Sequence, residues 1–142
     1  MAARFAQWSY VLISLAVPAN AQESLPQIEA RAAERKAHGD AAGALAAWQK
    51  AARLDPKSAR IEDEIGFLLA VLQRPDEAIR HFERAIQLDA HLPAAQYHLG
   101  VAYWIQGDPA RSIPHLQSAV ALDDGYVASC LETPLGPLSK VV

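Results

Sequence analysis

The sequence has few of the residues that mark a disulfide scaffold, a nucleic-acid binder or a membrane span. Of its 142 residues only one is a cysteine, Cys130, so no disulfide can form within the chain, and we expect a small buried apolar residue there. A formal net charge of −3 gives no electrostatic reason to expect nucleic acid or an anionic membrane as a partner. The apolar run from Trp8 to Val17 is too short to cross a bilayer, which takes about 20 residues.

The sequence also lacks the spacings that hold metals or catalytic groups. It contains no His-Glu-x-x-His, Cys-x-x-Cys, Gly-x-Ser-x-Gly or Gly-x-Gly-x-x-Gly pattern. Two histidines, His81 and His115, are expected about 10 Å apart on packed helices, too far to share one zinc ion at about 2 Å per bond. The acidic run at 62–64 is interpreted as a solvated helix start, where the helix dipole favours negative charge. We therefore expect no enzymatic activity, no metal and no cofactor.

What the sequence does have is an internal repeat. The pair Leu-Asp recurs at Leu54-Asp55, Leu88-Asp89 and Leu122-Asp123, in steps of 34 residues. Other residues keep the same step, namely Ala51, Ala85 and Ala119, then Gly66 and Gly100, Pro75 and Pro109, and His81 and His115. A fixed period of this length predicts a stack of small units, and it disfavours a helical bundle whose spacing arose by chance.

Each unit is predicted to be a pair of antiparallel helices. In the second copy, one apolar face recurs at helical spacing and consists of Ile61, Ile65, Leu68, Leu69 and Leu72. Pro75 then suits the first turn of a new helix, because the amide hydrogen that proline lacks would have no partner there. The second apolar face consists of Ala78, Ile79, Phe82, Ala85, Ile86 and Leu88.

The repeated residues resemble the tetratricopeptide repeat, which has small residues where two helices cross closely and large residues beside them. Its pattern positions hold Gly66, Leu69, Ala78, Phe82, Ala85 and Ala90 in the second copy, and Gly100, Tyr103, Ser112, Leu116, Ala119 and Asp124 in the third. The first copy offers Ala32, Arg35, Ala44, Trp48, Ala51 and Pro56. The resemblance implies an all-α, right-handed α-solenoid of three helical hairpins, at about 25–58, 59–92 and 93–126.

The two ends of the chain are predicted to differ from the repeats. Residues 1–21 have the layout of a secretory signal peptide, with Ala19 and Ala21 as the small residues of a cleavage site before Gln22. Its compact, alanine-rich form resembles bacterial signals, so we expect an exported protein, periplasmic or secreted, that leaves the membrane once the signal is cleaved. An uncleaved N-terminal anchor is the alternative.

A short C-terminal helix, Tyr126 to Glu132, is expected to cover part of the last repeat. Two prolines and a glycine then stop it, which makes 22–132 the repeat domain and 133–142 a flexible tail. The incompletely covered C-terminal face could pair with another copy of the chain. An oligomerising assembly subunit, or the N-terminal part of a larger repeat protein, is therefore the alternative functional hypothesis.

The resemblance also implies a functional site. In this family the first helix of each hairpin lines a concave groove, and the first copy offers Glu29, Ala33 and Lys36 at its ligand-facing positions. The later copies offer Arg60, Asp63, Phe67, Tyr97, Val101 and Trp104. A charged half beside an aromatic half suits a peptide or helix of a partner protein, so we expect a protein-interaction scaffold. Acidic residues at 63 and 64 disfavour the C-terminal carboxylate that some members of the family clamp with lysine and asparagine.

Overall fold

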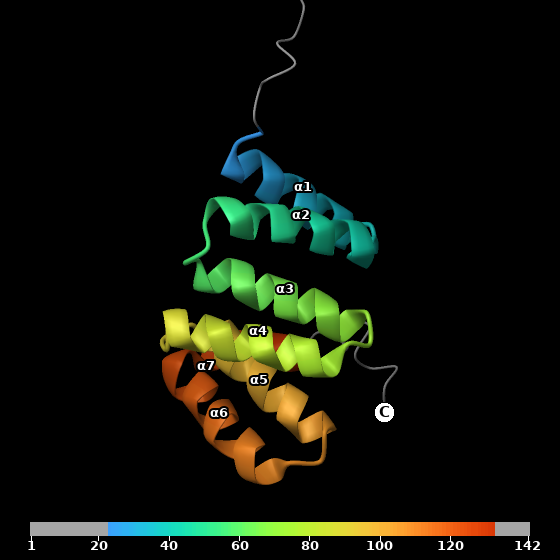
Figure 1. Ribbon diagram of the computed structural model, residues 1–142. Helices are drawn as coiled ribbons and strands as arrows, with labels where there is room; N and C mark the ends of the chain where they lie inside the picture. Colours follow the sequence, from blue (N-terminus) through green and yellow to red (C-terminus); the bar gives the residue numbers. More distant parts are fainter. Residues whose placement is uncertain (1–22, 133–142) are drawn as a thin grey trace, which may run out of the picture.

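Three helical hairpins follow one another along a stack, and one more helix closes it (Figure 1). The computed structural model describes residues 23–132; the predicted signal peptide, its cleavage site and the predicted tail lie outside this range. In order, the helices are α1 (Leu25–Ala37), α2 (Ala41–Leu54), α3 (Ala59–Val71), α4 (Pro75–Leu88), α5 (Pro93–Ile105), α6 (Pro109–Leu122) and α7 (Asp124–Glu132). Within 23–132 there is no β-strand, so the predicted all-α solenoid with a short C-terminal helix is confirmed.

The turn inside each hairpin uses a residue in the left-handed backbone region. These residues are Gly39 (φ 76°), Gln73 (φ 60°) and Gly107 (φ 76°), which occupy equivalent places in the repeat. The next amide in each turn donates a hydrogen bond of 2.9 Å to the carbonyl five residues earlier, which closes the end of the first helix. Glycine adopts this conformation at no steric cost, whereas Gln73 has a Cβ that disfavours it.

The two helices of a hairpin approach each other closely at a glycine. A Cβ placed on Gly66 would lie 2.6 Å from the Phe82 ring, and one on Gly100 would lie 2.7 Å from Leu116. Real Cβ atoms do not tolerate such distances, so glycine sets the separation of the helices at both places. At the second crossing the buried Ser112 hydroxyl also donates a hydrogen bond of 2.8 Å to the carbonyl of Gly100.

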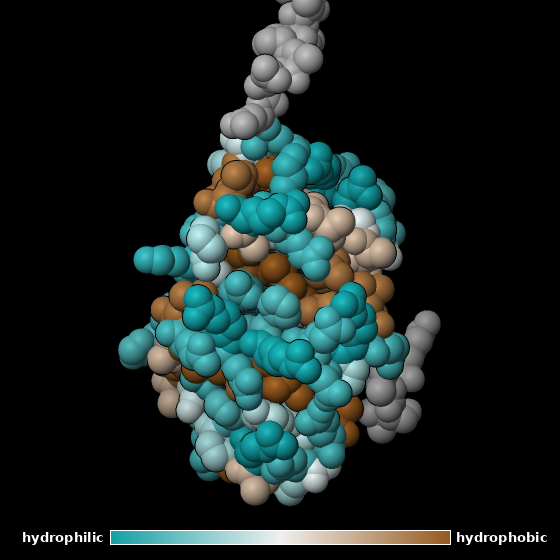
Figure 2. Space-filling view, viewed as in Figure 1, coloured by the Kyte–Doolittle hydropathy of each residue, from teal (hydrophilic) through white to brown (hydrophobic). Residues whose placement is uncertain are grey.

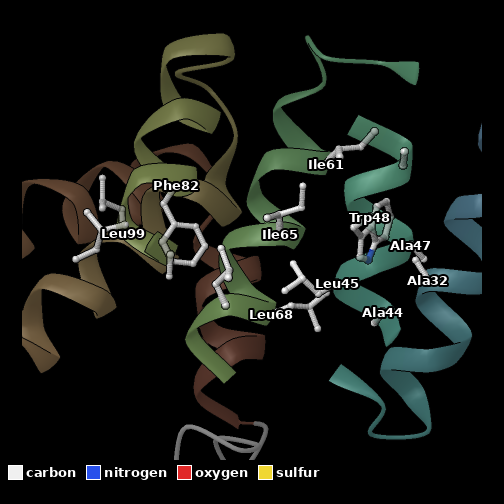
Figure 3. Packing of buried hydrophobic residues seen from close by; sticks show 14 of the residues in the cluster. Ala32, Ala44, Leu45, Ala47, Trp48, Ile61, Ile65, Leu68, Phe82 and Leu99 are labelled. Atoms are coloured by element: carbon white, nitrogen blue, oxygen red, sulfur yellow. The ribbon is translucent and has the colours of Figure 1, made fainter. Parts of the chain in front are cut away.

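The apolar core continues from one hairpin to the next (Figure 3). Leu68 of α3 lies beside Leu45 of α2, and Ile61 lies toward Trp48; all four are buried. On the other side of α3 the core continues through Phe82 of α4 and then Leu99 of α5; a representative set of its members is Ile28, Ala44, Leu45, Trp48, Ile61, Ile65, Leu68, Phe82 and Leu99. Each large aliphatic side chain buried in this way contributes about 1.5–3 kcal/mol relative to an exposed one.

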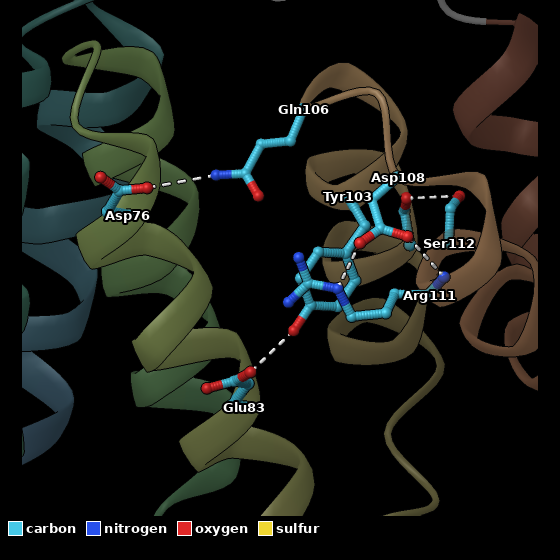
Figure 4. A network of polar contacts seen from close by, with 8 residues as sticks. Asp76, Glu83, Tyr103, Gln106, Asp108, Arg111 and Ser112 are labelled. Atoms are coloured by element: carbon cyan, nitrogen blue, oxygen red, sulfur yellow. Dashed lines mark hydrogen bonds and ion pairs between the residues drawn. The ribbon is translucent and has the colours of Figure 1, made fainter.

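Polar contacts join the second hairpin to the third (Figure 4). The Tyr103 hydroxyl donates to a Glu83 carboxylate oxygen at 2.7 Å, and the Gln106 amide donates to Asp76 at 3.1 Å. Burial raises the pKa of the Tyr103 hydroxyl, and the hydrogen bond to Glu83 raises it further. These contacts complement the apolar joint between α4 and α5 at its more exposed edge.

The repeated histidines link the first helix of a hairpin to the second. His81 Nδ1 lies 2.7 Å from Glu62 Oε2, and His115 Nδ1 lies 2.8 Å from Gln96 Oε1. The same repeat position therefore makes the same kind of helix-to-helix contact in two hairpins. In the part of the chain that the structure describes, no three His, Cys, Asp or Glu side chains are grouped so that they could hold a metal ion.

The stack is bent toward its odd-numbered helices. Helix α3 contacts α5, and α5 contacts α7, whereas even-numbered helices of successive hairpins make no comparable contact within residues 23–132. The face lined by α1, α3 and α5 is therefore the concave side. On the view in Figure 2, hydrophilic side chains cover α4. No helix within residues 23–132 is long and apolar enough to span a membrane.

Candidate functional site on the concave face

Two helices carry the predicted groove residues. Helix α3 bears Arg60, Asp63 and Phe67, and α5 bears Tyr97, Val101 and Trp104 at helical spacings of three or four. Residues at these spacings lie on one side of a helix, and α3 and α5 contact each other. The six predicted residues therefore belong to one continuous surface, although their exposure differs strongly.

The N-terminal part of this surface neutralises its own charges. Arg60 forms an ion pair with Glu29 of α1, and Lys36 Nζ lies 2.8 Å from a carboxylate oxygen of Glu64. The same ammonium group lies over the Phe67 ring, 4.2 Å from its centroid. Each contact links α1 to α3, so the charged residues join two hairpins as well as forming a surface.

Asp63 is buried, with 5% of its surface exposed, so the expected solvated helix start is wrong at this residue. Its Oδ1 lies 2.8 Å from Nδ1 of His98, one repeat later on α5. A buried carboxylate needs such a partner, because an unpaired buried charge is costly. His98 in turn has its ring centroid 5.4–5.8 Å from those of Phe67, Phe82 and Tyr97.

His98 was not identified from the sequence as part of this site. The signal that was available is its separation of 35 residues from Asp63, one repeat plus one residue. This separation places the two side chains on adjacent first helices. The aromatic neighbours and the carboxylate together hold the imidazole at the joint between α3 and α5.

Helix α7 covers part of the concave face. Its Tyr126 packs edge-on against Tyr97, with 6.2 Å between the ring centroids. Burial raises the pKa of the Tyr126 hydroxyl far above its ordinary value, and a hydrogen bond with Cys130 and the nearby Asp63 carboxylate raise it further. Cys130 is half-buried on the same helix. Tyr97 and Asp63 therefore lie beneath α7 in this structure.

The position of α7 follows from its short connection. Four residues, 55–58 and 89–92, separate one hairpin from the next, whereas Asp123 alone separates α6 from α7. In Figure 1 most of α7 is hidden behind α4, so α7 does not extend the stack beyond α6 as a further hairpin would. The short connection leaves α7 directed into the concave side, with Tyr126 over α5.

The uncovered end of the concave face is apolar. Trp104 at the end of α5 has 61% of its surface exposed, and the adjacent Ile105 is also exposed. Val101, one turn before Trp104 on α5, is half-buried. Phe67 on the neighbouring helix α3 is half-buried too. An exposed tryptophan beside partly buried apolar side chains can make large contacts with an apolar group of a ligand.

The fold and this face define a class, the solenoids of helical hairpins with a concave interaction surface. Residues 65–127 match the family model described as "Tetratricopeptide repeat". This match and the 34-residue period agree with the resemblance to the tetratricopeptide repeat family. Among curated protein sequences, none matches the chain.

Solved structures similar to this one are tetratricopeptide proteins. MamA superposes with a TM-score of 0.66 at 18% identity, covering 75% of this chain and 62% of MamA, so the chain spans less than two thirds of that protein. The second TPR of Spaghetti, bound to an HSP90 peptide, gives a TM-score of 0.67 at 18% identity, covering 72% of this chain and 94% of that one.

A third similar structure is the type III secretion translocator chaperone SycD of Yersinia enterocolitica. It gives a TM-score of 0.69 at 19% identity, covering 78% of this chain and 87% of SycD. At these identities the likeness shows a shared fold.

Proposed function

We propose that this chain is a non-catalytic protein-interaction module that holds an extended or helical segment of a partner protein on its concave face. The observation that carries the proposal is Trp104, an exposed aromatic side chain at a concave position of the repeat. The bound peptide of Spaghetti and the chaperone role in the name of SycD support a role of this kind for the shared fold.

The chemistry of the face favours an apolar segment over a free carboxylate. Lys36 and Arg60 already have acidic partners, Glu64 and Glu29, so a ligand carboxylate would have to compete with those partners. Trp104, Val101 and Phe67 offer apolar surface that needs no charged ligand. A partner segment with one or two large apolar side chains fits this arrangement.

The six predicted residues divide into two roles under this proposal. Arg60, Phe67, Val101 and Trp104 face the partner segment. Tyr97 and Asp63 lie under α7 and hold α5, α3 and α7 together through Tyr126 and His98. The ligand-contacting surface is therefore smaller than the groove expected from the sequence.

Photocrosslinking in the producing cell tests the proposed site directly. A benzoylphenylalanine residue is placed at Trp104, and a matched control at Leu54, which is also exposed but lies at the end of α2. We expect a crosslinked partner at position 104 that is absent at position 54, identified by mass spectrometry. Equal crosslinking at both positions, or none at 104, contradicts the proposal.

Affinity measurements on the captured partner then separate contact from folding. Trp104→Ala should weaken binding by about 30-fold, the loss expected for an aromatic anchor worth about 2 kcal/mol. Its helical signal and melting temperature should stay those of the parent, because the side chain is mainly exposed. Leu54→Ala is the control and should leave the affinity unchanged.

The proposal includes export. Residues 1–21 have the layout of a signal peptide, so the working protein starts at Gln22 in the periplasm or outside the cell. The intact mass of the protein recovered from the exported fraction decides this point. A mass that includes Met1 would show that residues 1–21 are retained as an anchor.

A further inference from the structure

Helix α6 has far less charge on its exposed side than α4, the second helix of the preceding hairpin. Between Ser112 and Leu122 it has no aspartate, glutamate, lysine or arginine. One repeat earlier, the exposed side of α4 carries Asp76, Arg80, Glu83 and Arg84; the equivalent residues of α6 are Ala110, Pro114, Gln117 and Ser118. Four exposed positions that are charged in α4 are therefore uncharged in α6.

The side of α6 that faces along the stack is apolar and uncovered. Ile113 is 48% exposed, whereas its equivalents Ile79 and Leu45 are 9% and 6% exposed beneath the first helix of the next hairpin. Val120 is 49% exposed, and its equivalents Ile86 and Ala52 are partly buried against the core. Helix α7 does not replace the missing neighbour at these two residues.

Three residues define the surface, which we call the α6 face: Ile113, Gln117 and Val120. Their spacing of four and three residues places them on one side of the helix. Exposed apolar side chains on one such line, without charges between them, are typical of a buried interface. The α6 face is separate from the proposed ligand site, because Trp104 belongs to α5.

The polarity of the two ends of the stack decides which partner fits. At the N-terminal end, Glu23 forms ion pairs with Arg31 and Lys50 at 2.7 and 2.9 Å. Head-to-tail stacking of copies would place this charged cluster against an apolar surface and desolvate it. Contact of one α6 face with another buries apolar side chains on both sides and leaves no charge unpaired.

We infer that two copies of this chain pair through their α6 faces about a two-fold axis. In such an isologous contact each copy offers the same surface. With the two helices antiparallel, Ile113 of one copy lies near Val120 of the other and Gln117 lies near the axis. A single helix pair gives an interface at the small end of the range for stable dimers, so we expect weak pairing that depends on protein concentration.

Sedimentation equilibrium of the full chain from about 1 to 200 µM tests this inference. We expect a monomer–dimer equilibrium for the parent chain, and at least a tenfold larger dissociation constant for Val120→Glu. Leu54→Glu, an equally drastic change at another exposed apolar residue, should leave the equilibrium unchanged. Residues 1–21 are common to all variants, so association through them would not respond to changes in α6.

A second variant distinguishes loss of pairing from misfolding. Gln117→Glu introduces the residue type that α4 carries in the same place as Glu83, so the hairpin is expected to tolerate it. Circular dichroism should show parental helical content, while two carboxylates near the axis should weaken dimers at least tenfold. Dimers that persist in both α6 variants, or a parent chain that stays monomeric at 200 µM, would overturn the inference.

Mixing variants tests the antiparallel register. Ile113→Lys and Val120→Glu should each be monomeric alone, because each homodimer would bury the same charge twice. Their mixture should form a heterodimer with one lysine–glutamate contact and one unchanged Ile113–Val120 contact. A mixture that remains monomeric while the parent dimerises would overturn the proposed pairing of the helices.

Discussion

The hairpin α3–α4 lies between two other hairpins, whereas α5–α6 has a full hairpin on one side and the nine-residue α7 on the other. The two hairpins have the same helix lengths and the same turn. Their difference lies in the burial of equivalent side chains, such as Ile79 and Ile113. A neighbour along the stack, more than the local sequence, decides how much each residue contributes to stability.

The largest contrast is expected at the large residue beside each crossing glycine. Phe82→Ala should lower the free energy of unfolding by about 3–5 kcal/mol, because the ring is buried in the continuous core. Leu116→Ala, at the equivalent place in the last hairpin, should cost about 1–2 kcal/mol, since this side chain is only half-buried. Chemical denaturation monitored by circular dichroism measures both. Equal losses would show that α7 covers the last hairpin as well as a full neighbour would.

Ile79 and Ile113, which face the next position along the stack, test the same comparison of the two hairpins. Ile79→Ala should lower stability by about 2–4 kcal/mol, and Ile113→Ala by about 0.5 kcal/mol or less. The measurement should be made at about 1 µM protein, where self-association through α6 contributes little. A large loss for Ile113→Ala at this dilution would mean that the residue packs within its own chain.

The next test places a larger side chain at the glycines where the two helices of a hairpin cross. Leucine at Gly66 or Gly100 should cost about 1–3 kcal/mol or more, because the added Cβ alone would overlap Phe82 or Leu116. Gly66→Leu lies in the central hairpin and should lower the whole melting transition. Gly100→Leu should unfold mainly α5–α7, seen as partial loss of helical signal. Parental melting of both variants would contradict the close crossing.

The smallest effect is expected in the turns. Gln73→Gly should raise stability by up to about 1 kcal/mol, because glycine relieves the strain of a positive φ. Gly107→Gln should lower stability by a similar amount, which makes the two variants mutual controls. Thermal unfolding of the pair measures both, and a loss of stability for Gln73→Gly would show that the glutamine side chain has a compensating contact.

The helices were predictable because their causes repeat along the chain. Leu54, Leu88 and Leu122 each end a second helix, as the recurring Leu-Asp pair indicates. Gly66 and Gly100 stand where two helices cross, which the pattern of small and large residues implied. Each of these features depends on contacts within one hairpin, so a sequence period of 34 residues carries them.

The candidate site was less predictable because it depends on contacts between hairpins. Asp63 is at the start of a helix, and only the packing of α3 on α5 brings His98 to it. Tyr97 was expected to face a ligand, and only the one-residue connection before α7 places Tyr126 over it. The scarcity of charged residues in α6 is visible in the sequence, but its meaning depends on which side of α6 remains uncovered in the fold.

The nearest-neighbour arrangement of the helices also bears on how the chain folds and opens. Most contacts between helices join helices that are adjacent in the sequence. The contacts of α3 with α5 and of α5 with α7 come next. Contacts of such short sequence separation need little loop closure, and helical proteins of this kind fold in microseconds to milliseconds. Opening is then expected to start at either end and progress inward. Amide hydrogens should accordingly exchange fastest in α7, more slowly in α1, and slowest in α3 and α4, where the core has neighbours on both sides.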